Sequence, residues 1–404
     1  MLRPPAGEFS AVRLNDQAFF GSLFLSRLAD QILLFLVPLV VFQMTQSVAW
    51  SGLAFSLETL PRFLSFPICG ILCDRVSPLR LLRVSQTCRA IACLAGMAGY
   101  AAFGGIGWLV GLSAVCGILS TQGMIAREVI MPQIFRQYRF EKVLSYSQIA
   151  DQMGLVLGPV LAAALLGWWQ WELVVAATAA VFLAADAALF LWRRMTRVEL
   201  AEPEAAPGHF LDPLRTAFSH VLHLPGLKMA IVLAAGVNLV IGVTLATAPA
   251  MVTGIHGRGE DFFAGLQVAG AVATIVVLMT VAHVPIRHRT LGVMAYGGMF
   301  AGAVISGASP GFWGYVAGFL LVVGFDKMFN IYVRSLRQRI IPPKDFGKTT
   351  GVVIMLNNLT QPLAGFVVGL VTAPAQTGWV VAGIGLVMGL IGVTVAVVSP
   401  PRTA

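Results

Sequence analysis

The chain has 404 residues, of which 57% are hydrophobic and only 11% are charged. A soluble domain carries about 25% charged residues, so this composition excludes an ordinary soluble protein and indicates that much apolar surface faces lipid. The formal net charge of +9 would favour a nucleic-acid partner in a soluble protein. Here the basic residues lie at the ends of apolar segments, as in positive-inside membrane proteins, so we expect no nucleic-acid partner.

Apolar segments long enough to cross a bilayer recur along the chain, since a spanning helix needs about 20 such residues. They lie at 17–43, 48–73, 81–103, 105–131, 144–167, 171–193, 225–252, 260–283, 289–308, 310–335, 347–372 and 377–398. The stretch 194–224 interrupts them with arginine, glutamate and proline. We therefore predict an all-α membrane protein with a six-helix bundle over 1–193, a linker over 194–224 and a second six-helix bundle over 225–404.

Basic residues in the connections indicate the orientation. They follow every second segment: Arg75, Arg80 and Arg83; Arg136, Arg139 and Lys142; Arg193, Arg194 and Arg197; Arg287 and Arg289; and Arg337, Arg339, Lys344 and Lys348. The opposite connections carry essentially only Arg258. Because basic loops remain on the cytoplasmic side, we expect both termini and the linker to be cytoplasmic, in the inner membrane of a bacterium.

A weak internal repeat relates the two halves, a pattern that transporters often show. A shift of 211 residues places Arg27 on Asn238 and Pro38 on Pro249, and a shift of 207 places Arg127 on Arg334, Asp151 on Asn358 and Gly158 on Gly365. The first half therefore has charged residues, Arg27 and Asp151, where the second half has amides.

The segment from Gly70 to Arg80 reads G-I-L-C-D-R-V-S-P-L-R and resembles the loop 2–3 motif of the major facilitator superfamily. The resemblance implies the major facilitator fold and a conformational latch formed by Gly70, Asp74, Arg75 and Arg80. In the family the glycine packs closely and the aspartate lies at a helix N-terminus, where a carboxylate gains up to about 2 kcal/mol. Ser77 and Pro78 depart from the motif, and the alternative is a charged turn that follows the positive-inside rule.

Two further segments resemble exporters of this superfamily. The segment G-L-V-L-G-P, from Gly154 to Pro159, resembles the family's G-x-x-x-G-P element, which implies efflux and gives Gly154, Gly158 and Pro159 a role in helix packing. Ordinary small-residue packing is the alternative. The segment S-R-L-A-D-Q, from Ser26 to Gln31, resembles the branch of macrolide-efflux proteins and enterobactin-type siderophore exporters.

Ionisable residues at membrane depth are costly unless paired or hydrated, so they are candidates for coupling or cargo binding. Arg27 and Asp30 share a face of the first segment, and Glu58 and Arg62 are spaced to pair along the second. The other candidates are Arg89, Asp151 and Asp326, with the amides Asn238, Asn357, Asn358 and Gln361. Asp326 and Lys327 are adjacent and point about 100° apart, so we expect them not to pair well.

Roles can be assigned to these charges as hypotheses. Asp30 and Glu58 are the deepest acids, and because a desolvated carboxylate holds a proton more tightly, we favour Asp30 as the coupling acid. Arg27, Arg62 and Arg89 are alternative contacts for anionic cargo. For Arg89, Asp186 and Lys327 the favoured interpretation is a structural ion pair or a side chain that reaches the interface.

We predict a secondary-active, proton-coupled exporter of a small amphipathic molecule, either a siderophore or a drug-like compound, that acts as a monomer by alternating access. The alternative is a lysophospholipid flippase of the same fold. The six histidines lie in loops or at span ends, and the five cysteines lie inside apolar segments. We therefore expect no metal site, no cofactor and no enzymatic activity.

Overall fold

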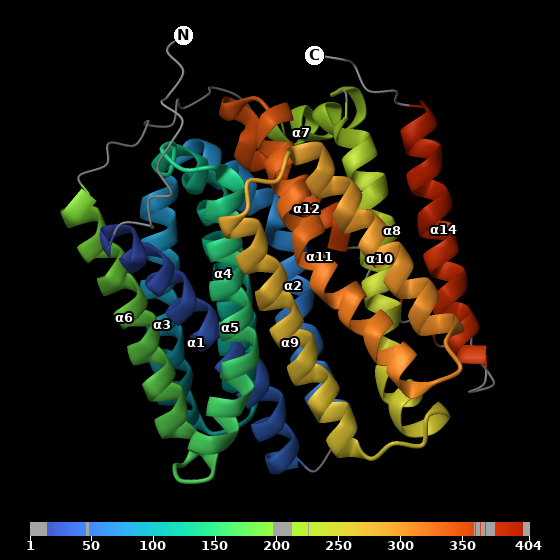
Figure 1. Ribbon diagram of the computed structural model, residues 1–404. Coiled ribbons are helices and arrows are strands. Elements are labelled where there is room, and N and C mark those ends of the chain that lie inside the picture. The colour runs from blue at the N-terminus through green and yellow to red at the C-terminus, as the bar shows by residue number, and fades with distance from the viewer. Residues whose placement is uncertain are drawn as a thin grey trace. The chain divides into compact units, whose positions relative to one another are not determined.

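The computed structural model describes residues 14–45, 48–196, 212–224 and 226–358, residues 360, 364 and 368, and residues 376–398. In this part of the chain the regular secondary structure is helical throughout, without strands. Figure 1 shows the helices, which are α1 (Leu14–Thr45), α2 (Val48–Arg75), α3 (Pro78–Phe103), α4 (Gly107–Ile134), α5 (Phe140–Leu166), α6 (Trp171–Thr196), α7 (Asp212–His223), α8 (Leu227–Pro249), α9 (Glu260–His283), α10 (His288–Ala308), α11 (Phe312–Ile340), α12 (Phe346–Asn358) and α14 (Thr377–Val398). A π-helical segment, Ala250–Ile255, continues α8.

Among the described residues, nine helical segments are long and apolar enough to cross a membrane, and they belong to α1, α4, α5, α6, α8, α9, α10, α11 and α14. α2 and α3 are helices of 28 and 26 residues that coincide with two more of the expected spans. α12 covers the start of the expected span 347–372, most of whose remainder lies outside the described residues. The expected all-α membrane architecture is confirmed.

The polar stretch 194–224 contains a short helix that the hydropathy pattern did not indicate. α7 is amphipathic, with Ala217 and Val221 buried. It lies across the beginning of α12 (Figure 1), where His220 Nδ1 is 3.1 Å from the hydroxyl oxygen of Thr349. The end of this stretch is therefore packed against the helices that follow it.

The chain divides into two compact units. Unit 1 comprises Met1–Glu58, Arg83–Ser120 and Met153–Ala201, and unit 2 comprises Thr59–Leu82, Thr121–Gln152 and Glu202–Ala404. The boundary passes through α2, α3, α4 and α5, so one end of each of these helices packs with α7 to α14 in unit 2. The division into halves 1–193 and 225–404 stays a prediction from the sequence.

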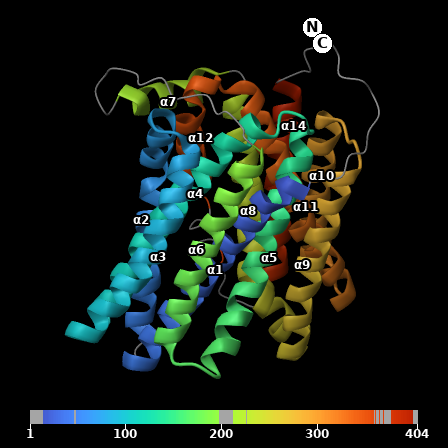
Figure 2. The ribbon, with the colours of Figure 1, turned by 90° about the vertical axis from the view of Figure 1, so that its left-hand side faces the viewer.

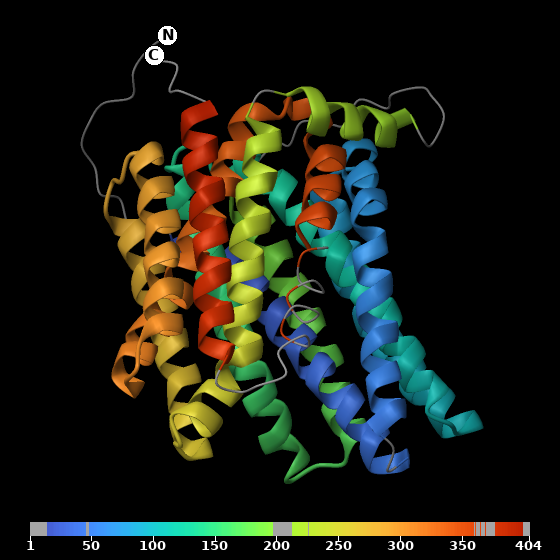
Figure 3. The same cartoon turned by 90° about the vertical axis from the view of Figure 1, so that its right-hand side faces the viewer.

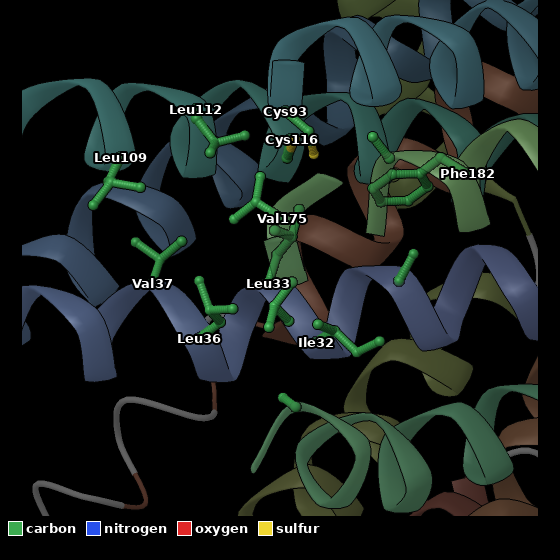
Figure 4. Packing of buried hydrophobic residues seen from close by; sticks show 14 of the residues in the cluster. Ile32, Leu33, Leu36, Val37, Cys93, Leu109, Leu112, Cys116, Val175 and Phe182 are labelled. Atoms are coloured by element: carbon green, nitrogen blue, oxygen red, sulfur yellow. The ribbon is translucent and has the colours of Figure 1, made fainter. Parts of the chain in front are cut away.

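Unit 1 is held together by an apolar core on α1, α3, α4 and α6. Leu33, Leu36 and Val37 of α1 meet Leu109 of α4 and Val175 of α6 in this core (Figure 4). α1 runs beside α6 (Figure 2), and the Ser22 hydroxyl donates to the Ala185 carbonyl oxygen at 2.6 Å. This packing fixes α1, which carries Arg27 and Asp30.

Helices of unit 2 pack closely through small residues. The glycines Gly302 of α10 and Gly318 of α11 face each other so closely that a β-carbon on either would lie 2.7 to 2.8 Å from the other's carbonyl oxygen. α14 lies next to α8 (Figure 3). Such contacts between small residues are a common basis of helix association in lipid, where hydrophobic burial offers little driving force.

Candidate functional site

A buried ion pair joins α1 and α3 in unit 1. Arg89 Nη1 lies 2.6 Å from Asp30 Oδ1, and the two side chains are only 1% and 7% exposed. Arg89 also donates to Ser26 Oγ at 2.9 Å and to the Ser85 carbonyl oxygen at 3.1 Å, while the Ser120 hydroxyl donates to Asp30 Oδ2 at 2.7 Å. Each guanidinium nitrogen therefore has an acceptor, as a buried charge requires.

The two charged residues that α1 was predicted to contribute make different contacts. Asp30 pairs with Arg89, whereas the side chain of Arg27 lies against α5, where a β-carbon on Gly154 would be 2.7 Å from Arg27 Cγ. Arg89 and Asp186 thus both belong to ion pairs, since Arg83 Nε lies 2.9 Å from Asp186 Oδ1. A purely structural role of these pairs stays a prediction. A role of Asp30 in coupling stays a proposal.

Helices α1 and α5 approach each other closely at the segment that resembles an exporter motif. A β-carbon on Gly158 would overlap Cβ of Gln31 and lie 3.2 Å from its carbonyl carbon. Pro159 follows inside α5. The two glycines, Gly154 and Gly158, therefore place α5 directly against the part of α1 that carries Arg27 and Asp30.

Asp74 lies beyond the expected span 48–73, at the end of α2, and accepts hydrogen bonds from the start of α12. Its two carboxylate oxygens accept from the backbone N–H groups of Gly347 at 2.8 Å and Lys348 at 2.9 Å. The positive end of the helix dipole and the two donors favour the carboxylate. Burial acts more strongly and raises the pKa of Asp74 to about 6, while the two backbone hydrogen bonds lower it.

The other residues of the loop motif are placed differently. Gly70 lies one turn before Asp74 and directly against Gly347, with no space for a side chain between the two backbones. Arg75 is half-buried and Arg80 is exposed. Gly70 and Asp74 thus form the contact with α12, and the two arginines lie beside it on the side of the basic loops.

We call this end of unit 2, where the basic connections after α2, α4, α9 and α11 lie, the basic end. Two acids that we did not single out from the sequence join α4 and α5 to α11 there. Glu128 lies 3.1 Å from Arg334 Nη1 and 3.6 Å from Arg337 Nη2. Glu141 accepts from the Ser335 hydroxyl at 2.7 Å and from Arg339 at 3.0 Å. Glu128 was visible as an acid within the apolar segment 105–131, and Glu141 as the acid that begins α5.

A cavity of about 510 Å³ lies in unit 2 between α8, α11 and α12. Its polar wall combines four amides and four charged residues, namely Asn238, Asn330, Asn357, Asn358, Asp326, Lys327, Arg334 and Arg337. Apolar residues such as Val237, Ile241 and Phe329 complete it. The predicted candidates Asn238, Asp326, Asn357 and Asn358 are therefore brought together on one wall, although they come from three helices.

The prediction that Asp326 and Lys327 would not pair well is wrong. Lys327 Nζ lies 2.8 Å from Asp326 Oδ2, because the long, flexible lysine side chain bends back over the angle that separates adjacent positions on the helix. The Asn330 amide also donates to Asp326 Oδ1 at 3.2 Å. Asp326 is thus already neutralised and hydrogen-bonded at the cavity wall.

Asp151 lies outside this cavity. Both of its carboxylate oxygens accept from Arg127, at 2.7 and 2.9 Å, in the forked geometry that arginine and carboxylate favour. The residues related to these two by the repeat, Arg334 and Asn358, both line the cavity. The first half thus contains a complete ion pair where the second half contains an arginine, an amide and open space.

The remaining predicted site residues are Glu58, Arg62 and Gln361. The side chain of Glu58 and all of Gln361 lie outside the described residues, so the expected pair of Glu58 with Arg62 stays a prediction. Arg62 is half-buried, and its carbonyl oxygen accepts from Thr121 at 3.3 Å. Within the described residues no group of three or more metal-binding side chains occurs.

Comparison with known proteins finds transporters of similar sequence and structure. The sequence model of the Major Facilitator Superfamily matches residues 19–364. An uncharacterized MFS-type transporter of Sinorhizobium fredii, y4rN, is 23% identical over 385 residues, which are 91% of each protein. This match extends over nearly the whole length of both proteins.

Solved structures of the same fold extend over nearly the whole chain. A bacterial homologue of the iron transporter ferroportin in an outward-facing state has a TM-score of 0.74 and 18% identity, covering 96% of this chain and all of the other. The transporter FucP in its outward conformation has a TM-score of 0.72 and 12% identity, covering 95% and 98%. At such low identity these likenesses show the fold alone.

Proposed function

Because the chain belongs to the major facilitator superfamily, we propose that it is a secondary-active exporter of a small amphipathic molecule, a siderophore or a drug-like compound. The observation that carries this proposal is the position of the cavity. Arg334 and Arg337 line the cavity and also approach Glu128 of α4 at the basic end. A molecule in the cavity is therefore next to charged contacts that have to separate before the basic end opens.

Alternating access requires that one side of the cargo path closes while the other opens. We infer that the basic end is cytoplasmic, because basic loops are retained there, and that this structure has its cytoplasmic side closed. Asp74, Glu128 and Glu141 support the inference, since each joins a helix of the first half to α11 or α12 through polar contacts. Polar contacts of this kind exchange readily for water when helices separate.

The direction of transport rests on the resemblance of the segment Gly154–Pro159 to an exporter element, and on the close packing of that segment against α1. The cargo does not follow from the structural neighbours, which are described as an iron-transporter homologue, a proton:xylose symporter and an organic anion transporter. A cavity wall with both apolar side chains and amides fits an amphipathic cargo.

We propose Asp30 as the proton-coupling acid. Protonation of Asp30 would remove the counter-charge of Arg89, and a buried, uncompensated guanidinium is strongly unfavourable. The contacts among α1, α3 and α4 that Ser26, Arg89 and Ser120 form would then rearrange. Proton binding is in this way linked to a change of packing in unit 1.

The experiment compares small molecules inside and outside cells that have or lack this protein, grown with and without iron, by mass spectrometry. We expect an amphipathic metabolite to accumulate inside cells that lack the protein and to return to the medium when the gene is restored. An iron-chelating metabolite would identify a siderophore as the cargo. No change in any metabolite would contradict export, and altered lysophospholipid distribution would favour the flippase of the same fold instead.

A further inference from the structure

We propose that the cavity of unit 2 binds an anionic group of a small organic molecule through Arg334 and Arg337, in competition with Glu128. The inference rests on the proposed function and specifies the charge of the cargo and the residues that hold it. Three features carry it: the balance of charge at the cavity, the incomplete hydrogen bonding of its arginines, and the comparison with the repeat-related ion pair.

Positive charge exceeds negative charge around the cavity. Lys327 and Asp326 neutralise each other at 2.8 Å. Arg334 and Arg337 remain, and the carboxylate that approaches them is that of Glu128. One carboxylate therefore serves two guanidinium groups, whose side chains are 14% and 4% exposed. A buried site with an excess cation favours an anionic ligand.

The existing contacts leave the arginines incompletely bonded. Arg334 Nη1 and Glu128 Oε1 are 3.1 Å apart, yet neither makes a hydrogen bond within the described part of the chain. Arg337 Nε and Asn357 Oδ1 are also buried without a hydrogen-bond partner there. Since buried donors left unbonded are costly, a ligand with a carboxylate or phosphate would find prepared donors, and a ligand hydroxyl group would find an acceptor in Asn357.

The repeat shows which chemical group is missing. In the first half Arg127 is bound by both oxygens of Asp151, at 2.7 and 2.9 Å. In the second half the corresponding arginine, Arg334, has Asn358 in place of the aspartate, and the two residues line the cavity together. The anionic group of the ligand would thus take the place that the Asp151 carboxylate has in the first half.

Competition with Glu128 connects binding to opening of the basic end. Glu128 belongs to α4, whereas Arg334 and Arg337 belong to α11. When the ligand draws both arginines toward the cavity, Glu128 loses its counter-charges, and the ion-pair contact between α4 and α11 is broken. Anion binding and the Glu128 contact therefore oppose each other, which gives Glu128 and Arg334 variants effects of opposite sign.

The test measures binding of citrate to the purified full-length protein by calorimetry, with lysophosphatidylglycerol as a second probe. We expect Arg334→Gln to weaken binding by more than about tenfold, and Glu128→Gln to strengthen it because the competitor is gone. Asn358→Asp restores the acid of the first half and should abolish binding while raising the melting temperature. Lys344→Gln, which removes an exposed cation outside the cavity, is the control and should change binding less than about twofold.

The two probes distinguish the source of the anionic group. If citrate shows the expected pattern, the group belongs to a soluble cargo, and if lysophosphatidylglycerol shows it, the group belongs to a lipid. If neither citrate nor lysophosphatidylglycerol binds to the unmodified protein or to Glu128→Gln, the inference is overturned. It is also overturned if the Asn358→Asp protein folds and still binds either probe. These results concern binding in the purified protein, so they are separate from the metabolite comparison that tests export.

Discussion

A β-carbon on Gly70 would overlap the carbonyl oxygen of Gly347, so α2 and α12 meet here with only backbone atoms between them. The same approach brings the N–H groups of Gly347 and Lys348 to the carboxylate of Asp74, one turn further along α2. The glycine contact and the carboxylate contact therefore depend on each other, because any side chain at Gly70 would move the donors away from Asp74.

We predict that Gly70→Ala shifts the protein toward a state with the basic end open. Overpacking of this kind costs about 1–3 kcal/mol, and this cost falls on the closed state alone. Spin labels on Gln137 and Lys344, which are both exposed at the basic end, report the separation by pulsed electron resonance after the native cysteines are replaced. We expect a longer distance population in Gly70→Ala.

The control for this measurement is Gly297→Ala, because a β-carbon on Gly297 has no neighbour within 4 Å. It should keep the distance distribution of the unmodified protein. An unchanged distribution in Gly70→Ala would mean that the contact of α2 with α12 adapts to a side chain and does not hold the basic end closed.

Because Asp74 titrates in the contact with α12, we predict that the distance between the spin labels on Gln137 and Lys344 depends on pH. Burial raises the pKa of Asp74 to about 6 in the closed contact, whereas an exposed aspartate has a pKa of about 4. The closed state therefore binds the proton more tightly, so closure is favoured at acidic pH and is progressively lost as the pH rises from about 4 to about 6. The spin-label distances should lengthen over this range and stay constant above it.

Asp74→Asn removes the titrating group and keeps one acceptor oxygen for α12. Its distance distribution should be independent of pH over the same range. A pH dependence that persists in Asp74→Asn would assign the titration to a group other than Asp74.

The fold could be predicted from the sequence because hydropathy and the positive-inside rule act over whole segments. Windows of about 20 apolar residues identify spanning helices whatever their partners are. The loop motif is local, and the contacts of Asp74 with a helix N-terminus and of Gly70 with a neighbouring backbone are those that the resemblance implies. α7 was missed because its burial depends on packing against α12, and its own composition is polar.

The partners of the membrane charges were harder to predict, since pairing depends on which helix faces which. Asp30 has Arg27 nearby in sequence, yet it pairs with Arg89 on α3. Glu128 was passed over because its partners, Arg334 and Arg337, are about 200 residues away in sequence. The repeat does relate Arg334 to Arg127 and Asn358 to Asp151 from the sequence alone, which indicates that Arg334 lacks the acidic partner that Arg127 has.

Loss of one partner of the Asp30–Arg89 pair should strongly destabilise unit 1. Because Arg89 is almost completely buried, Asp30→Asn leaves an uncompensated guanidinium and should cost about 3–5 kcal/mol. The double variant Asp30→Asn with Arg89→Gln should be less destabilised than the sum of the single changes. Melting temperatures in detergent of the four proteins form the double-mutant cycle.

A second ion pair of unit 1 provides the matched comparison. Arg83 and Asp186 are 34% and 16% exposed, so Asp186→Asn should cost less than about 1 kcal/mol. Equal effects of Asp30→Asn and Asp186→Asn would show that the buried pair is hydrated in the membrane and would weaken the proposed link between protonation of Asp30 and repacking of α1.

Gly158→Ala tests whether the close approach of α5 to α1 serves transport as well as folding. The new β-carbon would overlap Gln31, the residue that follows Asp30, and the displacement of α1 should lower stability by about 1–3 kcal/mol. Because Asp30 would move with Gln31, transport of the cargo should fall more than protein abundance does. Gly111→Ala, where a β-carbon has no neighbour within 4 Å, should leave both unchanged. If transport per folded protein is the same in Gly158→Ala as in Gly111→Ala, then Gly158 contributes to packing and the exporter element carries no separate role in moving cargo.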